Sequence, residues 1–204
     1  MSDFHQNGVI STLHNLSSRS LDEIERELRD YSKSAPIELI LPSLYSELDG
    51  PALKNIVECL SKIKYLNHIT VGLDRATKKE YIKAKEFFSN LNQSHSVLWN
   101  DSPKMKKLDK DFMALGIAPD QAGKGKNVWY CMGYTYSRNE AKSVALHDCD
   151  IMTYSRELLA KLVYPVANPH FNYEFCKGYY PRVRDGSLGG RAVSYTHLTL
   201  PTTE

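Results

Sequence analysis

The sequence predicts an α/β domain in which a mostly parallel sheet is flanked by helices. Short apolar runs alternate with segments of helical spacing, and strands that alternate with helices of about ten or more residues are typical of parallel sheets. The chain has 204 residues, of which 42% are hydrophobic, and this is enough for one sizeable core. Polar residues follow several apolar runs. In a parallel sheet the carboxyl ends of the strands gather at one edge, where ligands bind.

The first helix is predicted for residues 21–31. Apolar residues recur there at steps of three and four, and Ser20 and Glu23 form a capping-box pattern that opens an amphipathic helix. Residues 1–20, which are rich in Ser, Asn and His, are expected to form a flexible leader.

Four strands are predicted from short apolar or β-branched runs. They comprise residues 37–41, which we expect Pro42 to end, and residues 68–73, 96–99 and 143–146. The segments between them have helical spacing and comprise residues 53–63, 77–91, 103–115 and, after a Gly123-Lys124-Gly125 turn, a segment from residue 128 to near Asn139. The predicted order therefore alternates strands and helices, as a parallel sheet requires.

Charge and composition argue against several classes of protein. The 26 basic and 24 acidic residues give a net charge of +2, so we expect no nucleic-acid partner. No run approaches the roughly 20 apolar residues of a membrane helix, and no apolar signal-peptide core is present, so we expect a cytoplasmic protein without a membrane partner. The four cysteines contain no CxxC pair, so neither a zinc knuckle nor a disulfide framework is predicted.

The sharpest chemical signal is the tripeptide Asp148-Cys149-Asp150 at the end of the fourth predicted strand. Two carboxylates one residue apart at a strand end can hold a hard divalent cation, which usually serves a phosphate. The alternative is a turn, in which Asp is common for its own backbone hydrogen bonds. His147 and Cys149 alternate to the far face of the strand, so we expect core packing for the histidine and no nucleophilic thiol at the site.

The order of five short motifs resembles that of the glucosyl-3-phosphoglycerate synthase family, whose members are nucleotide-sugar transferases of the GT-A type. The landmarks of that family are a PALNE-like strand end, a GKG turn, a DxD motif, an FxKGxYxR segment and a GRVT loop. Here, between residues 38 and 191, they read PSLYSE, GKG, DCD, FCKGYYPR and GGRA. The asparagine and glutamate of PALNE are Tyr45 and Ser46, with Glu47 one place late, so the match implies no specific uracil contacts at that strand.

The resemblance implies a GT-A fold, incomplete at the carboxyl terminus, and a metal-dependent, retaining transfer of glucose. The donor would be a nucleoside diphosphate sugar, the acceptor the 2-hydroxyl of 3-phosphoglycerate, and the cofactor Mg²⁺ or Mn²⁺. A homodimer is an option for the full-length enzyme. The third metal ligand of the family lies beyond the GR loop, so we expect this chain to bind donor weakly and not to turn over. No catalytic residue is assigned.

The resemblance also assigns roles residue by residue. The metal ligands it implies are Asp148 and Asp150. The donor contacts it implies are Pro42, Leu44, Asp74, Gly123, Lys124, Asp148 and Asp150, and the acceptor contacts are Lys177, Gly190 and Arg191. Two alternatives stay open: Asp74 could cap the helix that starts near Thr77, and Lys124 could be a solvated turn lysine.

Residues 192–204 are expected to be a non-native tail. Residues 193–202 read VSYTHLTLPT, which looks like the translation of a sequencing-library adapter, the transposon end followed by its primer site. The alternative is a genuine chain terminus, which resequencing of the locus would reveal. If the tail is foreign, residues 21–191 form the nucleotide-sugar-binding GT-A domain of a longer enzyme.

Two rival functions use the same aspartates. Haloacid-dehalogenase phosphatases carry DxDxT, in which the first Asp attacks phosphorus and the second acts as acid or base, but Met152 stands where that motif has Thr. The other rival is a non-catalytic nucleotide-binding domain. Phosphate release from a phosphomonoester would indicate the first. Metal-dependent donor binding that Asp148→Ala and Asp150→Ala both abolish would favour the transferase site over the second.

Overall fold

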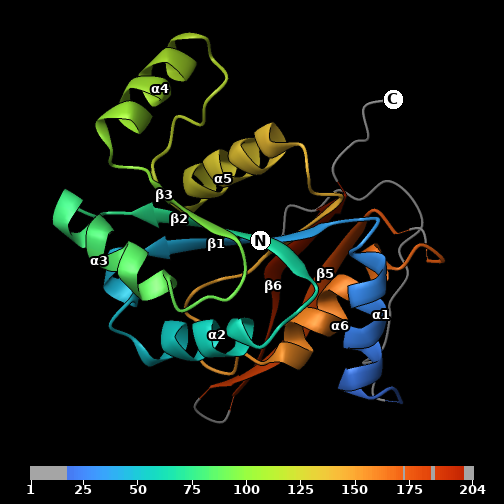
Figure 1. Ribbon diagram of the computed structural model, residues 1–204. Helices are drawn as coiled ribbons and strands as arrows, with labels where there is room; N and C mark the ends of the chain where they lie inside the picture. The colour runs from blue at the N-terminus through green and yellow to red at the C-terminus, as the bar shows by residue number, and fades with distance from the viewer. Residues whose placement is uncertain (1–17, 172, 185–186, 200–204) are drawn as a thin grey trace.

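A sheet of four parallel strands forms the centre of the molecule in the computed structural model, which describes residues 18–171, 173–184 and 187–199 (Figure 1). The strands are β1 (Ile37–Leu44), β2 (Leu66–Asp74), β3 (His95–Trp99) and β4 (Ser143–Leu146), in the order β3-β2-β1-β4. All three pairings within this group are parallel. The predicted α/β class with a mostly parallel sheet is therefore confirmed.

Helices cover both faces of this sheet. They are α1 (Leu21–Tyr31), α2 (Pro51–Ser61), α3 (Lys78–Phe88), α4 (Pro103–Ala114), α5 (Lys124–Arg138) and α6 (Arg156–Ala167), with a 3₁₀ helix at Tyr45–Glu47. Figure 1 shows α4 and α5 on one side of the sheet and α2 and α6 on the other. Side chains alternate along β1, so that Leu39 and Leu41 join the larger core while Ile40 packs with Cys131 beneath α5.

The local signals in the sequence locate most helices correctly. Ser20 and Glu23 form the predicted capping box of α1, and Ile24 and Leu28 are its buried residues. In α3 the cap is Thr77, whose hydroxyl accepts the Glu80 N–H at 3.4 Å, while the Glu80 carboxylate accepts the Thr77 N–H at 2.7 Å. Both caps satisfy backbone donors that the first turn of a helix leaves unpaired.

The expectation that Pro42 ends the first strand is wrong, because β1 continues through Pro42 to Leu44. The His147 N–H donates to the Ile40 carbonyl, so the backbone groups of Ile40 point toward β4, as do those of residue 42 two positions on. Pairing with β4 ends at Ile40 and Leu146. The N–H that proline lacks therefore faces no strand, and its absence costs no ladder hydrogen bond.

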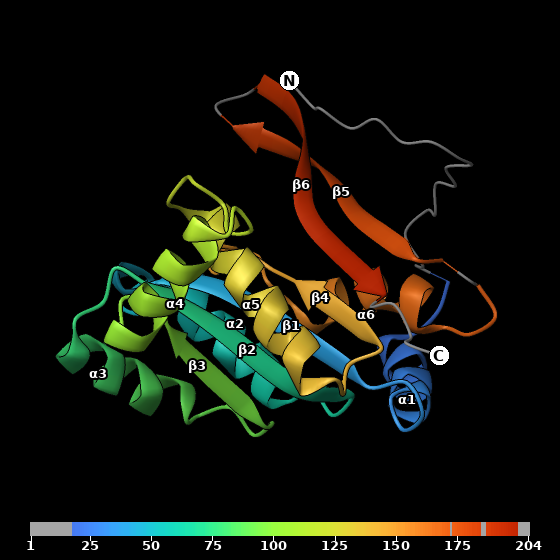
Figure 2. The ribbon, with the colours of Figure 1, turned by 90° about the horizontal axis from the view of Figure 1, so that it is seen from above.

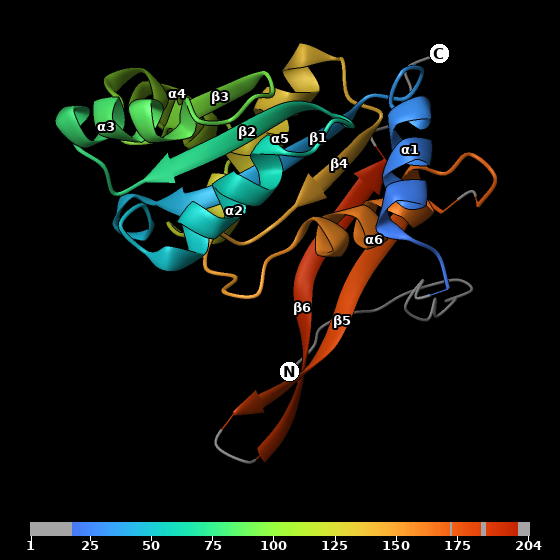
Figure 3. The ribbon, with the colours of Figure 1, turned by 60° about the horizontal axis from the view of Figure 1, so that its bottom comes forward.

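The end of the chain forms elements that the sequence analysis did not assign. Helix α6 begins after Ser155, whose hydroxyl accepts the Leu158 N–H. Strands β5 (Phe175–Arg184) and β6 (Ser187–Thr199) form an antiparallel hairpin, and β6 pairs antiparallel with β4. Figures 2 and 3 show the far end of this hairpin leaving the edge of the parallel sheet.

The predicted terminal segments are described only in part. Residues 1–17 of the expected leader and residues 200–204 of the expected non-native tail lie outside the described residues. Strand β6 spans residue 192, where that tail is expected to begin, and the four parallel strands pair with one another independently of β6. Within the part of the chain that is described, no helix is both long and apolar enough for a bilayer crossing.

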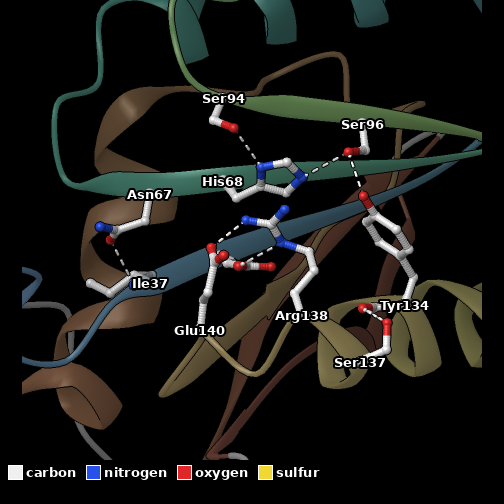
Figure 4. Close-up of polar contacts among 10 residues, drawn as sticks. Ile37, Asn67, His68, Ser94, Ser96, Tyr134, Ser137, Arg138 and Glu140 are labelled. Carbon is white, nitrogen blue, oxygen red and sulfur yellow. Dashed lines mark hydrogen bonds and ion pairs between the residues drawn. The ribbon is translucent and has the colours of Figure 1, made fainter.

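A buried polar network occupies the amino end of the sheet beneath α5, opposite the carboxyl ends of the strands (Figure 4). The ring nitrogens of His68 lie 2.9 Å from Ser94 Oγ and 3.1 Å from Ser96 Oγ. Ser96 in turn shares a hydrogen bond of 2.8 Å with the Tyr134 hydroxyl on α5. Burial lowers the pKa of His68 to about 4, so its ring is neutral at pH 7.

Candidate functional site

A cavity of about 500 Å³ lies at the carboxyl ends of the parallel strands. Its walls come from the ends of β1 and β2, the segments after β3 and β4, helix α4 and the first turn of α5. All seven residues predicted to contact the donor line it: Pro42, Leu44, Asp74, Gly123, Lys124, Asp148 and Asp150. The topology thus brings together side chains that are up to 108 positions apart in the sequence, from residue 42 to residue 150.

Glu47, which stands one place later than the glutamate of the PALNE pattern, binds the backbone and a side chain at the end of β1. Glu47 lies in the 3₁₀ helix, and its Oε2 accepts the Leu44 N–H at 2.8 Å and the Ser43 hydroxyl at 3.0 Å. Its side chain also lines the cavity. The carboxylate is therefore fixed at the strand end although it stands one position later than in the PALNE pattern.

Asp74 ends β2, and its carboxylate faces the cavity. The Asn100 side-chain amide donates to Asp74 Oδ1 at 2.7 Å. Burial raises the pKa of Asp74, against hydrogen bonds from Asn100 and Asn127 that lower it. Because Thr77 caps α3, the alternative that Asp74 is the cap of this helix is wrong.

The first turn of α5 forms another wall of the cavity. Gly123 precedes the helix with φ of 139°, a conformation that favours glycine. Lys124 is the first residue of α5, so the predicted start at residue 128 is four residues too late, and Lys124 is helical instead of a turn residue. The amino terminus of a helix presents free N–H groups and a positive dipole end, which favour anions such as phosphate.

Lys124 pairs with the first aspartate of the DxD motif. Its Nζ donates to Asp148 Oδ1, across the gap between α5 and the segment after β4. The Lys124 side chain is 52% exposed and that of Asp148 is 21% exposed, so solvent screens the attraction and both groups remain accessible from the cavity. Lys126, in the same turn, pairs with Asp109 of α4 at 2.6 Å.

The DxD carboxylates fit a divalent cation that arrives with a phosphate ligand. Asp148 and Asp150 both line the cavity, and Asp150 is exposed. No cluster of three or more His, Cys, Asp or Glu suited to a metal occurs among the described residues. Mg²⁺ is usually bound by one or two carboxylates together with water and substrate phosphates, so two aspartates at the edge of this cavity are a fitting donor set.

The residues beside the DxD motif are buried. His147 has no exposed surface, and its Nδ1 lies 3.0 Å from the Tyr154 hydroxyl, which confirms the predicted core packing. Cys149 departs from the prediction, because it borders the cavity instead of facing away from it. It is 3% exposed, and burial raises the pKa of its thiol far above the ordinary value, so the group stays protonated and does not serve as a nucleophile.

The predicted acceptor residues lie on the β5–β6 hairpin. Lys177 pairs with Thr196 across the hairpin, is partly buried, and is not among the residues that line the cavity. Gly190 and Arg191 stand opposite Pro181 and Tyr180 in the backbone ladder, and their side chains lie outside the described part of the structure. The described residues therefore do not join the acceptor set to the donor cavity, and the acceptor role stays a prediction.

Sequence analysis missed several residues that line the cavity. Asn100 and Asp101 directly follow β3, so the strand-end argument used for Asp74 would have found them. Asp101 accepts the Ala76 N–H at 3.0 Å and so braces the segment after β2. Asn127 of α5 also lines the cavity, and a single asparagine within a helix carries no local signal of such a position.

The helix-flanked parallel sheet, with a cavity at its carboxyl edge, defines an α/β domain of the doubly wound kind, to which the predicted GT-A type belongs. Its fold is similar to the crystal structure of glucosyl-3-phosphoglycerate synthase from Mycobacterium tuberculosis in complex with uridine diphosphate. The TM-score is 0.56 and the sequence identity 15%, over 96% of this chain and 63% of that one. At this identity the likeness concerns the fold alone.

Curated relatives identify the family more closely. The chain is 48% identical over 200 residues to glucosyl-3-phosphoglycerate synthase of Persephonella marina, covering 97% of this chain and 49% of that protein. It is 35% identical over 187 residues to the protein of the same name from Methanococcoides burtonii, covering 91% of this chain and 45% of that one. No family model matches the sequence. The chain is a homologue of the glucosyl-3-phosphoglycerate synthases and spans about half the length of the curated relatives it matches, which confirms the resemblance predicted from the motifs.

Proposed function

We propose that the full-length protein transfers glucose from a nucleoside diphosphate to 3-phosphoglycerate, and that this chain supplies the part that binds the donor. One observation carries the proposal: the ends of three strands and the first turn of α5 deliver all seven predicted donor residues to a single cavity. The names of both curated relatives support the same reaction. The uridine diphosphate in the similar crystal structure supports a nucleotide as the ligand of this fold.

In this proposal the donor diphosphate lies between the first turn of α5 and the DxD segment. Lys124 supplies a mobile positive charge, since its side chain is half exposed, and the adjacent helix terminus supplies backbone N–H donors. When phosphate oxygens approach, the Lys124 ammonium can leave the Asp148 carboxylate and pair with them. Asp74, held by Asn100, offers a fixed acceptor for hydroxyl or N–H groups of the nucleoside.

Asp148 and Asp150 are the residues that would hold Mg²⁺ or Mn²⁺. Such a cation neutralises the charge that develops on a departing nucleoside diphosphate. The contribution of the chain itself is to hold the two carboxylates at the cavity edge, through the end of β4 at Leu146 and the buried His147 that follows it.

The acceptor assignment rests on the motifs. Lys177 and Arg191 are cationic, and an Arg fork suits the phosphate or the carboxylate of 3-phosphoglycerate. Gly190 precedes Arg191 in the GR pair of the family pattern. The name that both relatives carry, glucosyl-3-phosphoglycerate synthase, supports this function over the haloacid-dehalogenase alternative.

Two measurements test the proposal. Calorimetric titration of uridine diphosphate into the chain, with and without Mg²⁺, should give metal-dependent binding that Asp148→Ala and Asp150→Ala each abolish. Incubation with UDP-glucose, 3-phosphoglycerate and Mg²⁺ should give no turnover by the 204-residue chain and glucosyl transfer by the full-length protein. Phosphate release from a simple phosphomonoester, or unchanged nucleotide binding in both variants, would reject the donor site.

A further inference from the structure

The first turn of α5 is held against β2 by a buried side-chain amide. Asn127 is 3% exposed, and its Nδ2 donates a hydrogen bond of 2.8 Å to the carbonyl of Gly72. Its Oδ1 accepts the Cys131 thiol at 3.4 Å, so the partners define which end of the amide is which. The backbone N–H of Asn127 bonds to the Gly123 carbonyl at 3.1 Å, which closes the first turn of the helix.

Gly72 provides the space for this contact. A Cβ atom at this position would lie 1.8 Å from Asn127 Oδ1 and 2.5 Å from Cys131 Sγ. Gly72 and Asp74 share one face of β2 because they are two residues apart, and Asn127 and Asp74 both line the cavity. Asn127 therefore contacts the strand that carries Asp74 and belongs to the turn that carries Lys124.

The other polar side chains of this turn reach away from β2. Lys124 pairs with Asp148 in the segment after β4, and Lys126 pairs with Asp109 of α4. Both lysines have long side chains that can follow a shifted helix, whereas the short amide of Asn127 is enclosed and cannot. The distance between the first turn of α5 and the sheet thus depends on Asn127 and on the missing side chain of Gly72.

We propose that Asn127 is a positioning residue of the donor site: it fixes the first turn of α5, which carries Lys124, in place relative to Asp74 and Asp148. This inference rests on the proposed function, because it assumes that the cavity binds a nucleoside diphosphate. Charged groups bind a phosphate well only when their geometry is held to within about 0.5 Å, so a first turn that is free to shift weakens the site without losing any ligand contact.

The probe is uridine diphosphate with Mg²⁺, titrated by calorimetry into the 204-residue chain and its Asn127→Ala and Asn127→Ser variants. We expect the Kd of each variant to rise about tenfold, which corresponds to about 1.4 kcal/mol. Tyr134→Phe is the matched control: it removes the hydrogen bond to Ser96 that ties the far end of α5 to the sheet, and Tyr134 is not among the residues that line the cavity. Its Kd should stay within about twofold of the unaltered chain.

A double-mutant cycle with Lys124→Ala separates positioning from a general loss of stability. If Asn127 acts through the placement of Lys124, Asn127→Ala weakens binding much less when Lys124 is already absent. Asn127→Ser carries the test if the alanine variant does not fold. Unchanged binding in a folded Asn127 variant, or purely additive effects in the cycle, would overturn the inference and leave the proposed function intact. Absence of binding by the unaltered chain would overturn the proposed function and this inference with it.

Discussion

Replacing Arg138 with methionine leaves the carboxylate of Glu38 buried without its cation. Glu38 has no exposed surface, and its Oε1 lies 3.4 Å from Arg138 Nε at the amino end of the sheet. Two unit charges at this distance attract by about 5 kcal/mol at an effective dielectric constant of about 20. Desolvation offsets part of this attraction, and the Arg138 side chain is 22% exposed, so we expect Arg138→Met to lower the free energy of unfolding by about 3 kcal/mol at neutral pH.

Urea unfolding followed by circular dichroism measures this loss. Burial raises the pKa of Glu38, and a carboxyl whose folded pKa is raised favours the folded state when it is protonated. The loss should therefore shrink as the pH falls from about 7 to about 5, and adding Glu38→Gln to Arg138→Met should recover most of it. Glu140→Gln removes the exposed partner of the same arginine and should change stability by less than about 1 kcal/mol. A loss below about 1 kcal/mol in Arg138→Met, or no recovery on adding Glu38→Gln, would refute the reasoning.

Three further predictions concern glycine, histidine and aspartate positions. Gly72→Ala should lower the thermal unfolding temperature, with a loss of about 2 kcal/mol, because its Cβ would overlap Asn127, whereas Gly133→Ala, with nothing within 4 Å, should raise it slightly. The pKa of His68 in the folded state, about 4, lies below the ordinary value of 6.5. Its contribution to stability is therefore full above pH 6.5 and is lost as the pH drops toward 4. His68→Gln should reduce this dependence of the free energy of unfolding on pH, measured by urea unfolding. Asp150→Asn should weaken Mg²⁺-dependent binding of uridine diphosphate in calorimetry while the unfolding temperature stays unchanged, because Asp150 is exposed; equal loss with and without Mg²⁺ would contradict a metal role.

The elements that the sequence predicts well carry their signals locally. The capping box of Ser20 and Glu23 and the apolar run at residues 143–146 mark α1 and β4 with the observed boundaries. Two of the boundaries that differ from the prediction have clear physical causes, one distant in the sequence and one local. Pro42 lies inside β1 because β4 is too short to face it, and α5 begins at Lys124 because Gly123 can adopt a positive φ.

The candidate site likewise contains residues that a local sequence pattern predicts and residues that it does not. Strand-end logic finds Asp74 and Asp148, and the glycine-flanked lysine finds Lys124, since each follows a recognisable local pattern. Cys149 borders the cavity although strand alternation places it on the far face, because the ladder gives way to a turn after His147. Asn127 is invisible to such reasoning, because its role comes from a glycine 55 positions earlier in the chain.

β4 has only four residues, and whether the number of residues in it is odd or even determines which way the side chains just after it point. The His147 N–H still bonds to the Ile40 carbonyl and the His147 side chain is buried, whereas Asp148 comes next and lines the cavity. Insertion of a single residue into β4 would exchange these two directions, burying a carboxylate and turning an imidazole toward the ligand space. Insertion of two residues would keep the directions and advance the acidic pair by about 7 Å along the strand. Natural variation in the length of β4 is therefore expected in steps of two, with the depth of the cavity changing at each step.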